Sequence, residues 1–589
     1  MPHIIDLALA PSDQQPDELT SEELAALASS RLDGLPIATA RLLRFSFDAR
    51  RRVRRWQVKL EAFEPDEEVT PAFEVPAPIA APESSAKHVV VIGSGPAGLV
   101  ASIELLRAGL RVTLLERGFD VQRRRKDLAS IHRGVPVDAD SNYCHGEGGA
   151  GTYSDGKLYT RSGDGGDVRG VLELLVAHGA PDSILSDWRP HIGSNRLPKV
   201  VAAISDTIRA GGGEVRFGAR AIELETRAAS GGEEFPEVTG VVVETRSADP
   251  DDDSRRTETL ACDAVILATG HSALDALAMA GRAGAVLEAK GFAMGLRVEH
   301  PQPWLDELQY GGLRGPASLP AAFYELVTER KGRGVYSFCM CPGGFIVPAS
   351  TGADRMVVNG MSLSRRDSPF ANSGIVVAIE PEDLCGGKGL RWGAAKLLRA
   401  AIESGGDPFG AAKDLIPTAE RLADGWLPDE PRDEPLVGIV VQRALELEAA
   451  LWGGGDNCAP AQRADDFIAG AGGVTEPLET SYQAGLTGVD LARLLPRGLS
   501  ERLRRGVADF DERLRGFGGK HGQVVGVESR TSSPARIPRE SDTREAIGLR
   551  GLFPAGEGAG YAGGIVSAAI DGGRVARGVV LRLGVPSQG

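Results

Sequence analysis

Residues 88–98 read His88-Val89-Val90-Val91-Ile92-Gly93-Ser94-Gly95-Pro96-Ala97-Gly98, and an amphipathic stretch through Arg107 follows them. The apolar run is typical of a buried strand, and the glycines behind it have GxGxxG spacing. In a strand, turn and helix of this kind, Gly93 permits the tight turn, Gly95 lets the backbone approach a pyrophosphate, and Gly98 lets the helix pack closely on the strand. The pattern predicts a dinucleotide site at the start of the helix, where backbone N–H groups face the phosphates.

A second apolar run, Val112–Leu115, follows this helix and ends in Glu116 and Arg117. Glu116 stands about twenty residues beyond the glycines, where a carboxylate accepts hydrogen bonds from the ribose hydroxyls of a bound adenosine. We therefore expect Glu116 to contact the ribose. The other residues that we expect near the cofactor in this part of the chain are Pro96, Ala97 and Arg117.

The bulk composition narrows the class of protein. A chain of 589 residues is long enough for two or three cooperating units, and its 76 glycines indicate many tight turns. A net charge of -15 argues against a general nucleic-acid binder. The six cysteines have no regular spacing, and the N-terminus has no basic region before a long apolar run, so we expect a cytoplasmic protein. No apolar stretch reaches the roughly eighteen residues of a membrane span.

The first 63 residues are predicted to form a small α+β module. An apolar run at 4–9, a helix that begins near Ser21, and strands at 40–47 and 56–63 make it up. Residues 48–55 form a basic cluster, which is a candidate to dock RNA or an acidic partner, although a solvated hairpin turn is the interpretation we favour. Residues 64–86 are rich in Pro, Glu and Ala and are predicted to be a semi-extended linker.

Segments later in the chain distinguish FAD from NAD as the cofactor. A strand over Ala264–Ala268 ends in Ala268-Thr269-Gly270, and Gly551–Gly558 precedes a helix that extends to about Leu583. These segments resemble the later part of the two-dinucleotide-binding-domain flavoproteins, in which such turns lie near FAD. The resemblance implies that FAD is contacted by Ala268, Thr269, Gly270, Gly556, Glu557, Gly563, Gly564 and Ile565. Backbone N–H groups at the start of the last helix would stabilise negative charge on the reduced flavin. The acidic insertion 249–253 is predicted to be a hairpin loop between strands at 238–244 and 264–268.

Three further segments carry a closer resemblance: His145–Leu158, Ser337–Gly344 and Gly556–Gly564. Together they resemble FAD-dependent dehydrogenases of unestablished substrate, from about Lys87 to the C-terminus, and the N-terminal module is also similar. The resemblance implies an α/β fold in which a Rossmann-type FAD-binding domain carries an inserted α+β substrate domain. The expected boundaries are 1–63 for the module, 64–86 for the linker, 87–273 and 528–589 for the FAD-binding domain, and 274–527 for the insertion.

The loop at 146–158 is the leading candidate for the flavin face. Its expected cofactor contacts are Gly148, Gly149, Gly151, Thr152 and Ser154. Lys157 is a candidate to steady the flavin or an anionic substrate, with a solvated lysine as an equal alternative. The sequence does not identify the catalytic residues, and the candidates are Tyr153, Asp155, Lys157, Arg297 and His300. We expect no metal site.

Residues 295–300 alternate as in a strand, which places Arg297 and Glu299 on one face and His300 on the other. These side chains are candidates to bind a carboxylate or move a proton, but an exposed strand face is the interpretation we favour. Cys339 and Cys341 flank one methionine and are either a redox pair or, as we favour, two buried thiols in a strand.

Two other segments have alternative interpretations. His145 precedes paired glycines, much as the flavin-linked histidine does in fumarate-reductase-like flavoproteins, so covalent attachment is a remote alternative. Arg530–Arg536 either binds an anion with two guanidiniums or forms a hinge loop.

Three functions are compatible with the sequence. No second GxGxxG follows a strand, so the chain lacks the separate nicotinamide domain of disulfide reductases. We favour an FAD-dependent oxidoreductase that passes hydride between the flavin and a small molecule, with NADH or NADPH as a candidate transient electron donor. A flavin monooxygenase is the second alternative. The third is a flavin-carrying RNA-binding or tRNA-modifying protein, in which the N-terminal module and its arginines contact nucleic acid.

Overall fold

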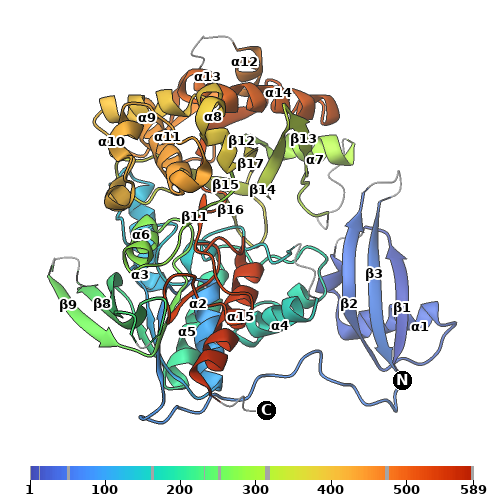
Figure 1. Ribbon diagram of the computed structural model, residues 1–589. Helices are drawn as coiled ribbons and strands as arrows, with labels where there is room; N and C mark the ends of the chain where they lie inside the picture. The colour runs from blue at the N-terminus through green and yellow to red at the C-terminus, as the bar shows by residue number, and fades with distance from the viewer. Residues whose placement is uncertain are drawn as a thin grey trace.

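The computed structural model describes residues 2–11, 14–49, 54–160, 165–230, 232–247, 249, 252, 254–311, 319–470 and 476–585. A small sheet built from the N-terminus stands beside a larger body, and the body contains two main sheets, one above the other in the view of Figure 1. The arginines at 50–52 of the basic cluster and most of the acidic insertion at 249–253 lie outside the described residues. Among the described helices, none is both long and apolar enough to cross a membrane.

The N-terminal module contains the elements that its sequence predicts. Three antiparallel strands have the order β1-β3-β2, with bounds β1 His3–Leu9, β2 Thr39–Asp48 and β3 Arg55–Phe63. Helix α1 (Ser21–Arg31) begins after Thr20, whose hydroxyl accepts the N–H of Glu23 while the Glu23 carboxylate accepts the N–H of Thr20. Trp56 and Leu60 of β3 are buried between the sheet and α1. The helix expected near Ser21 is therefore confirmed.

A five-stranded parallel sheet forms the base of the body, in the order β22-β10-β4-β5-β6. Its strands are β4 His88–Ile92, β5 Arg111–Leu115, β6 Glu214–Arg216, β10 Ala264–Leu267 and β22 Leu552–Pro554. The helices around it are α2 Pro96–Arg107, α3 Val121–Ile131, α4 Gly165–Ala177, α5 Leu197–Ala210, α6 Leu274–Arg282 and α15 Ile565–Leu583. Parallel strands with covering helices confirm the α/β, Rossmann-type fold class.

The predicted hairpin has another second strand in the structure, where it is part of a three-stranded antiparallel sheet. This sheet consists of β7 Ala219–Arg227, β8 Glu237–Arg246 and β9 Arg255–Ala261, so the acidic insertion connects β8 with β9. The expected pairing of 238–244 with 264–268 is wrong. Residues 264–267 form β10, which is buried along its whole length because it pairs on both sides inside the parallel sheet, whereas β9 is largely exposed.

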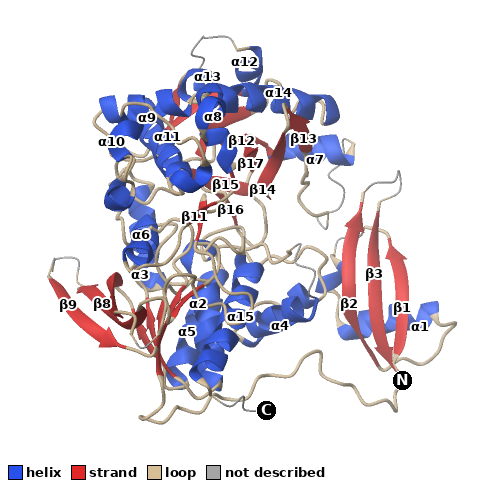
Figure 2. Ribbon diagram, viewed as in Figure 1, coloured by secondary structure: helices blue, strands red, loops and turns tan. Residues whose placement is uncertain are grey.

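The second main sheet has seven strands in the order β13-β14-β17-β12-β20-β18-β19. Its strands are β12 Phe292–Pro301, β13 Val327–Arg330, β14 Arg333–Cys341, β17 Phe370–Ile379, β18 Ala459–Arg463, β19 Leu486–Gly488 and β20 Gln523–Glu528. All of them lie, in sequence, between β10 and β22, which are neighbours in the parallel sheet. The helices of this part gather mainly on the side away from the parallel sheet (Figure 2).

Shorter elements complete the upper part of the body. The helices are α7 Gln302–Tyr310, α8 Gly386–Trp392, α9 Ala394–Glu403, α10 Ala419–Ala423, α11 Val437–Gly453, α12 Ala464–Ala469, α13 Leu491–Leu494 and α14 Arg497–Arg513. A hairpin of β15 Gly344–Pro348 and β16 Val358–Ser362, and a two-stranded pair of β11 Glu288–Ala289 and β21 Ala535–Arg536, lie between the two main sheets (Figure 1).

Candidate functional site

The turn between β4 and α2 has the geometry that its glycines predict. Gly93 has φ +105°, and a Cβ there would lie 2.4 Å from the carbonyl oxygen of Ala268. A Cβ at Gly98 would lie 1.9 Å from the carbonyl oxygen of Gly93, so helix and strand are in close contact. At Gly95, by contrast, a Cβ would have no described atom within 4 Å. The space in front of α2 is open, and Gly95 has no side chain to cap the first N–H groups of the helix.

The loop at 148–151 lies against this turn. The N–H of Gly148 donates to the carbonyl oxygen of Ser94 at 3.1 Å, and a Cβ at Gly149 would lie 3.2 Å from the Cα of Gly95. A Cβ at Gly151 would contact Ile565, the first residue of α15, at 3.1 Å. The two glycine segments and the start of the last helix thus meet at one place.

Turns that follow β10 and β22 close the other side of the same space. A Cβ at Gly558 would lie 2.3 Å from the carbonyl oxygen of Gly270, and His271 Nδ1 lies 3.3 Å from Glu557 Oε2. Gly564 caps α15 without a side chain, and a Cβ there would meet no described atom within 4 Å. The remaining expected contacts of this region, Ala268, Thr269, Gly556 and Gly563, lie in the same turns.

The hydroxyls of the 152–154 segment are already bound within the loop. Thr152 Oγ1 donates to the carbonyl oxygen of Glu147 at 2.9 Å, and Ser154 Oγ donates to that of Gly151 at 2.7 Å. Pro96 and Ala97 form the first turn of α2, where α15 packs against it: a Cβ at Gly572 would lie 2.1 Å from the carbonyl oxygen of Ala97. Contacts of these residues with a cofactor stay predictions.

Glu116 lies at the end of β5, as expected, but protein donors already surround it. Its Oε2 accepts the N–H and hydroxyl of Ser94 at 3.1 and 2.7 Å, and its Oε1 accepts the N–H groups of Gly118 and Gly146, both at 2.9 Å. Burial raises the pKa of Glu116, but these hydrogen bonds outweigh it and the net pKa is lowered. A ribose hydroxyl would have to replace one of these donors, and the Ser94 hydroxyl is the one that can rotate away.

Arg117 lies between two carboxylates. Its guanidinium is 2.6 Å from Asp140 and 3.0 Å from Asp275, and Arg220 also contacts Asp275 at 2.7 Å. His145 lies near Glu116, at the ribose end of the site, and lines neither of the two pockets described below. Its position gives no support to covalent attachment of a flavin ring.

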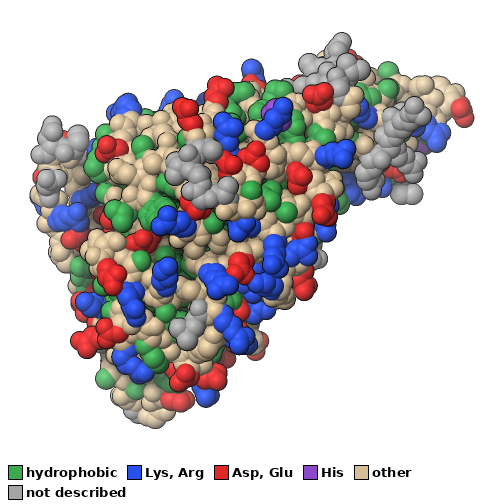
Figure 3. All heavy atoms as spheres, turned by 90° about the horizontal axis from the view of Figure 1, so that it is seen from above, with side chains coloured by type: hydrophobic (Ala, Val, Ile, Leu, Met, Phe, Trp, Pro, Cys, Tyr) green, Lys and Arg blue, Asp and Glu red, His purple; other side chains and the backbone are tan. Residues whose placement is uncertain are grey.

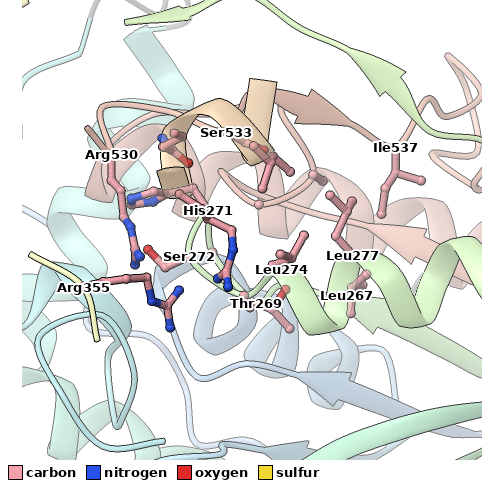
Figure 4. Close-up of a pocket in the computed structure, with 17 residues that line it drawn as sticks. Leu267, Thr269, His271, Ser272, Leu274, Leu277, Arg355, Arg530, Ser533 and Ile537 are labelled. Atoms are coloured by element: carbon pink, nitrogen blue, oxygen red, sulfur yellow. The ribbon is translucent and has the colours of Figure 1, made fainter. Parts of the chain in front are cut away.

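Two connected pockets continue from this space toward the seven-stranded sheet. The first encloses about 550 Å³ including its open mouth. Its polar end contains His271, Ser272, Arg355 and Arg530, and its apolar end contains Leu267, Leu274, Leu277 and Ile537 (Figure 4). The second encloses about 440 Å³, shares His271 and Arg530 with the first, and is also lined by Tyr143, Cys144, Ala150, Tyr153, Ser154, Asn359 and Glu528. Both pockets therefore have walls from both parts of the body.

The residues at this edge of the sheet fit FAD. Glycines leave open space at positions 95, 270, 563 and 564, and two helices begin there without a side-chain cap. Backbone N–H groups at uncapped helix starts are suited to a pyrophosphate, and the pockets beyond them have room for a larger ring system. The described residues contain no group of three or more His, Cys, Asp or Glu placed to hold a metal ion.

The structure separates the candidate catalytic residues. Tyr153 lines the second pocket, and its hydroxyl donates to the carbonyl oxygen of Val121 at 2.8 Å. Asp155 is buried and contacts Lys157 at 3.0 Å and Arg366 at 2.6 Å. Lys157 is mostly buried rather than solvated, and faces Cys339 and Cys341.

The strand at 295–300 is buried, so the exposed strand face is wrong. Arg297 donates to Glu528 Oε2 at 2.7 Å from a fully enclosed position. On the same face Glu299 accepts the N–H of Ser481 at 3.1 Å. His300 lies on the opposite face, where it stacks on Trp304 and bonds to the carbonyl oxygen of Phe517. The alternation was predicted correctly, and both faces are buried because Ser481 contacts one face and Trp304 and Phe517 cover the other.

Some residues around the pockets were not predicted, or were predicted for another role. His271 lines both pockets and directly follows the Ala-Thr-Gly turn, which is the signal that would have found it. Glu528 does not belong to a local sequence motif, so no signal in the sequence points to it. Arg530 does line both pockets, but its guanidinium is paired with Glu446 at 2.7 Å, while Arg536 is paired with Glu288. Each arginine is thus paired within the protein, and an anion held by both stays a prediction.

Comparison with known proteins agrees with this geometry. The model of the family "FAD-dependent protein, C-terminal domain-like" matches residues 291–413 and 425–531, and that of the "FAD binding domain" matches residues 88–124. A protein of Clostridium beijerinckii, described as uncharacterized, is 35% identical over 502 residues, which are 84% of this chain and 81% of that protein.

Solved structures are less similar. Mycobacterium smegmatis Sdh1 in complex with UQ1 is 15% identical with a TM-score of 0.31, and the match covers 85% of this chain and 70% of that one. A geranylgeranyl bacteriochlorophyll reductase-like protein from Thermoplasma acidophilum is 11% identical with a TM-score of 0.30, over 85% and 79%. Scores this low carry no argument about activity. The relative that is similar over most of both chains, with the two matched domains, shows that this chain belongs to the family of FAD-dependent proteins that share this C-terminal domain.

Proposed function

We propose that this chain is an FAD-dependent oxidoreductase that transfers hydride between the flavin and a small molecule bound between the two main sheets. The observation that carries the proposal is the convergence of the glycine turns after β4, β10 and β22 at the edge where both pockets begin. Ligands of open α/β sheets bind at the carboxyl ends of the strands, and here a second sheet covers that edge. A covered site of this kind limits the access of water to the reacting atoms.

FAD, when bound, supplies a carrier that accepts or donates hydride. The protein supplies binding, orientation and a proton. N–H groups at the start of α2 bind phosphate, and those at the start of α15 stabilise negative charge. Glu528 lines the second pocket, and burial raises its pKa despite the adjacent Arg297, so its carboxyl group is suited to hold a proton there. Arg297 fixes the position of that carboxyl group by donating to Oε2.

The first pocket suits a small molecule with a negative group and an apolar body. Arg355, Arg443 and Arg530 line it, and Leu274 and Leu277 form its apolar side. Burial, together with repulsion from Arg355 and Arg530, lowers the pKa of Arg443 to about 10. A bound anion would relieve this repulsion, which supports an anionic substrate.

The Gly95→Val variant tests the cofactor site. The new side chain would fill the open space in front of α2 without touching the described protein, so we expect a folded protein that has lost its flavin absorption near 450 nm after purification. Gly170→Val, in α4, is the matched control because a Cβ there also has open space around it. A Gly95→Val protein that retains a full complement of flavin would place the pyrophosphate elsewhere.

Anaerobic titration with NADH and then NADPH distinguishes the reaction classes. Bleaching of the flavin by either nucleotide would support a nicotinamide-dependent reductase. In a separate aerobic assay, rapid oxygen consumption coupled to a hydroxylated product would instead favour the monooxygenase. A flavin that neither nucleotide reduces would support a dehydrogenase reduced by its own substrate.

The described part of the N-terminal module favours a docking role over RNA binding. The Arg44 guanidinium lies 4.0 Å from the ring centroid of Trp188, and that of Arg54 lies 5.4 Å from that of Tyr310, so both arginines contact the body of the protein. On the face seen in Figure 3, basic and acidic side chains are interspersed. RNA retention that is equal in the full chain and in a chain without residues 1–63 would exclude the module as an RNA-binding unit.

A further inference from the structure

The ammonium group of Lys157 lies close to both Cys339 and Cys341, at the end of β14. Lys157 Nζ lies 3.7 Å from the Sγ atoms of both cysteines. The lysine approaches from the loop that also contacts the flavin-binding edge, and Asp155, only 1% exposed, holds it at 3.0 Å. Two thiols and a buried cation therefore form one cluster that the proposed hydride transfer does not use.

An irregularity in β14 brings the two thiols together. Phe338 pairs with Gly374 and Cys341 pairs with Asn372, so β14 has one residue more than β17 between these pairs. Cys339 has φ +45°, in the left-handed region that residues other than glycine seldom adopt. Bulges of this kind re-aim side chains and are frequent beside active sites.

The surroundings favour the thiolate form of Cys339 and the neutral thiol form of Cys341. The neighbouring Cys341 thiol, then the Lys157 ammonium and Arg297, lower the pKa of Cys339 to about 5 although burial opposes them. The pKa of Cys341 is raised by its contact with Cys339 and by burial. Burial raises the pKa of Cys385 to about 11, which shows the ordinary behaviour of an enclosed thiol in this protein. The thiolate is the nucleophilic form of cysteine.

We propose that Cys339 and Cys341 form a redox-active dithiol that exchanges with a disulfide-bearing small molecule, with Cys339 as the attacking thiolate and Lys157 as the residue that positions it. The Cys339 thiolate attacks one sulfur of the external disulfide, which forms a mixed disulfide and releases one thiolate. The Cys341 thiol then gives its proton to that thiolate and attacks the Cys339 sulfur. An intramolecular disulfide forms, the second external thiolate leaves, and two electrons have passed to the external disulfide.

This inference does not rest on the proposed hydride transfer. The two thiols line neither pocket, and the exchange needs only the dithiol and an external disulfide. The other charged groups around the cluster are Asp155, Arg297, Arg366 and Glu528. Cys339 is partly exposed, whereas Cys341 is buried.

The first test measures the rate of iodoacetamide alkylation of each cysteine against pH, by peptide mass spectrometry of the full-length protein. We expect the Cys339 rate to reach half its maximum near pH 5 and that of Cys385 to rise only in the alkaline range. Lys157→Met should slow Cys339 alkylation at pH 6, by about tenfold if the thiol pKa rises to about 7 and by about a further tenfold for each unit above that. Lys157→Arg should retain fast alkylation, and Lys87→Met, whose lysine pairs with Asp263, is the matched control.

The second test equilibrates the flavin-loaded protein with glutathione and glutathione disulfide. We expect a peptide that contains both cysteines to lose the mass of two hydrogens as the oxidised fraction rises, and to regain it on reduction. Cys339→Ser and Cys341→Ser should each abolish this change, and Cys385→Ser should not. A pair that stays reduced at every ratio, or a Cys339 that alkylates only above pH 8, would overturn the proposal, even if the flavin is still reduced normally.

Discussion

Glu299 and Glu446 are both buried glutamates, but only one of them has a cation beside it. Glu446 accepts two hydrogen bonds from Arg530, at 2.8 and 2.7 Å, whereas Glu299 is held by Ser481 and Gln523, which carry no charge. Burial raises the pKa of Glu299, and its hydrogen bonds only partly offset this. For Glu446 burial also raises the pKa, but Arg530 outweighs it and the net pKa is lowered.

The two residues should therefore affect stability with opposite dependence on pH. Because the pKa of Glu299 is raised in the folded protein, its protonated carboxyl group stabilises the fold below the unfolded pKa of about 4.3. This stabilisation is lost as the pH rises through the folded pKa. The free energy of unfolding of Glu299→Gln, relative to the parent protein, should increase from pH 5 to pH 8 in urea titrations. Equal differences at both pH values would contradict the assignment.

Glu446→Gln is the opposite case. The lowered pKa of Glu446 contributes stability above its unfolded value and loses it as pH falls through the folded value. Removal of one partner of a buried ion pair leaves Arg530 uncompensated, which costs about 3–5 kcal/mol at neutral pH. In urea titrations we expect this cost to shrink as the pH falls through the lowered pKa of Glu446, because the parent glutamate is then protonated as well.

Neither of these environments was visible in the sequence. Alternation along 295–300 gave the faces of Arg297, Glu299 and His300, because a strand has period two. It did not give their burial, which depends on residues from elsewhere in the chain that cover the two faces of β12, such as Ser481 on one face and Phe517 on the other. The pocket residues could not be predicted for the same reason. His271, Glu528 and Arg530 come together only through the sheet that joins their segments.

The contact between α2 and α15 is the tightest helix crossing in the cofactor site. A Cβ at Gly572 would lie 2.1 Å from the carbonyl oxygen of Ala97, whereas at the adjacent Gly573 the nearest atom, Val100 Cγ1, would be 3.6 Å away. Gly572→Ala should cost about 1–3 kcal/mol and weaken flavin binding, because the helices must separate. Gly573→Ala, its neighbour, should be stabilising by up to about 1 kcal/mol, since alanine favours the helix. Thermal unfolding and flavin retention of the two variants provide the measurement.

Elements defined by local signals were predictable, and their partners often were not. The strand, glycine turn and helix at 88–107 carry their own signature within one segment, as does the capping pair Thr20 and Glu23 at the start of α1. The strand at 264–267 was found but assigned a hairpin partner. Short apolar runs do not reveal whether they pair with a neighbour in sequence or enter a parallel sheet.

The N-terminal module is held to the body by backbone and ring contacts. Phe45 N–H donates to Ser186 at 2.9 Å, Trp188 N–H donates to Phe45 at 3.0 Å, and the Phe47 ring meets Tyr310 edge-on. Glu68, in the segment 64–86 that joins module and body, is exposed. We expect glutamyl endopeptidase to cut there and the two fragments to elute together in gel filtration.

A double substitution tests the docking contacts. Arg44→Ala with Phe47→Ala removes the contact of Arg44 with Trp188 and that of Phe47 with Tyr310, so a larger fraction of the fragments should separate after the cut. Arg31→Ala is the control, because Arg31 lies exposed in the last turn of α1. Fragments that separate without any substitution would show that the joining segment alone keeps the module in place.

Strands of the parallel sheet come from distant parts of the chain: β4 begins at His88, whereas β22, which pairs with β10, begins only at Leu552. During translation, a nascent chain presents the first glycine turn long before the ribosome has made the strand and helix that complete the binding edge. The complete binding edge exists only after β22 and α15 have been made. A chain that is released before α15 is therefore expected to be colourless.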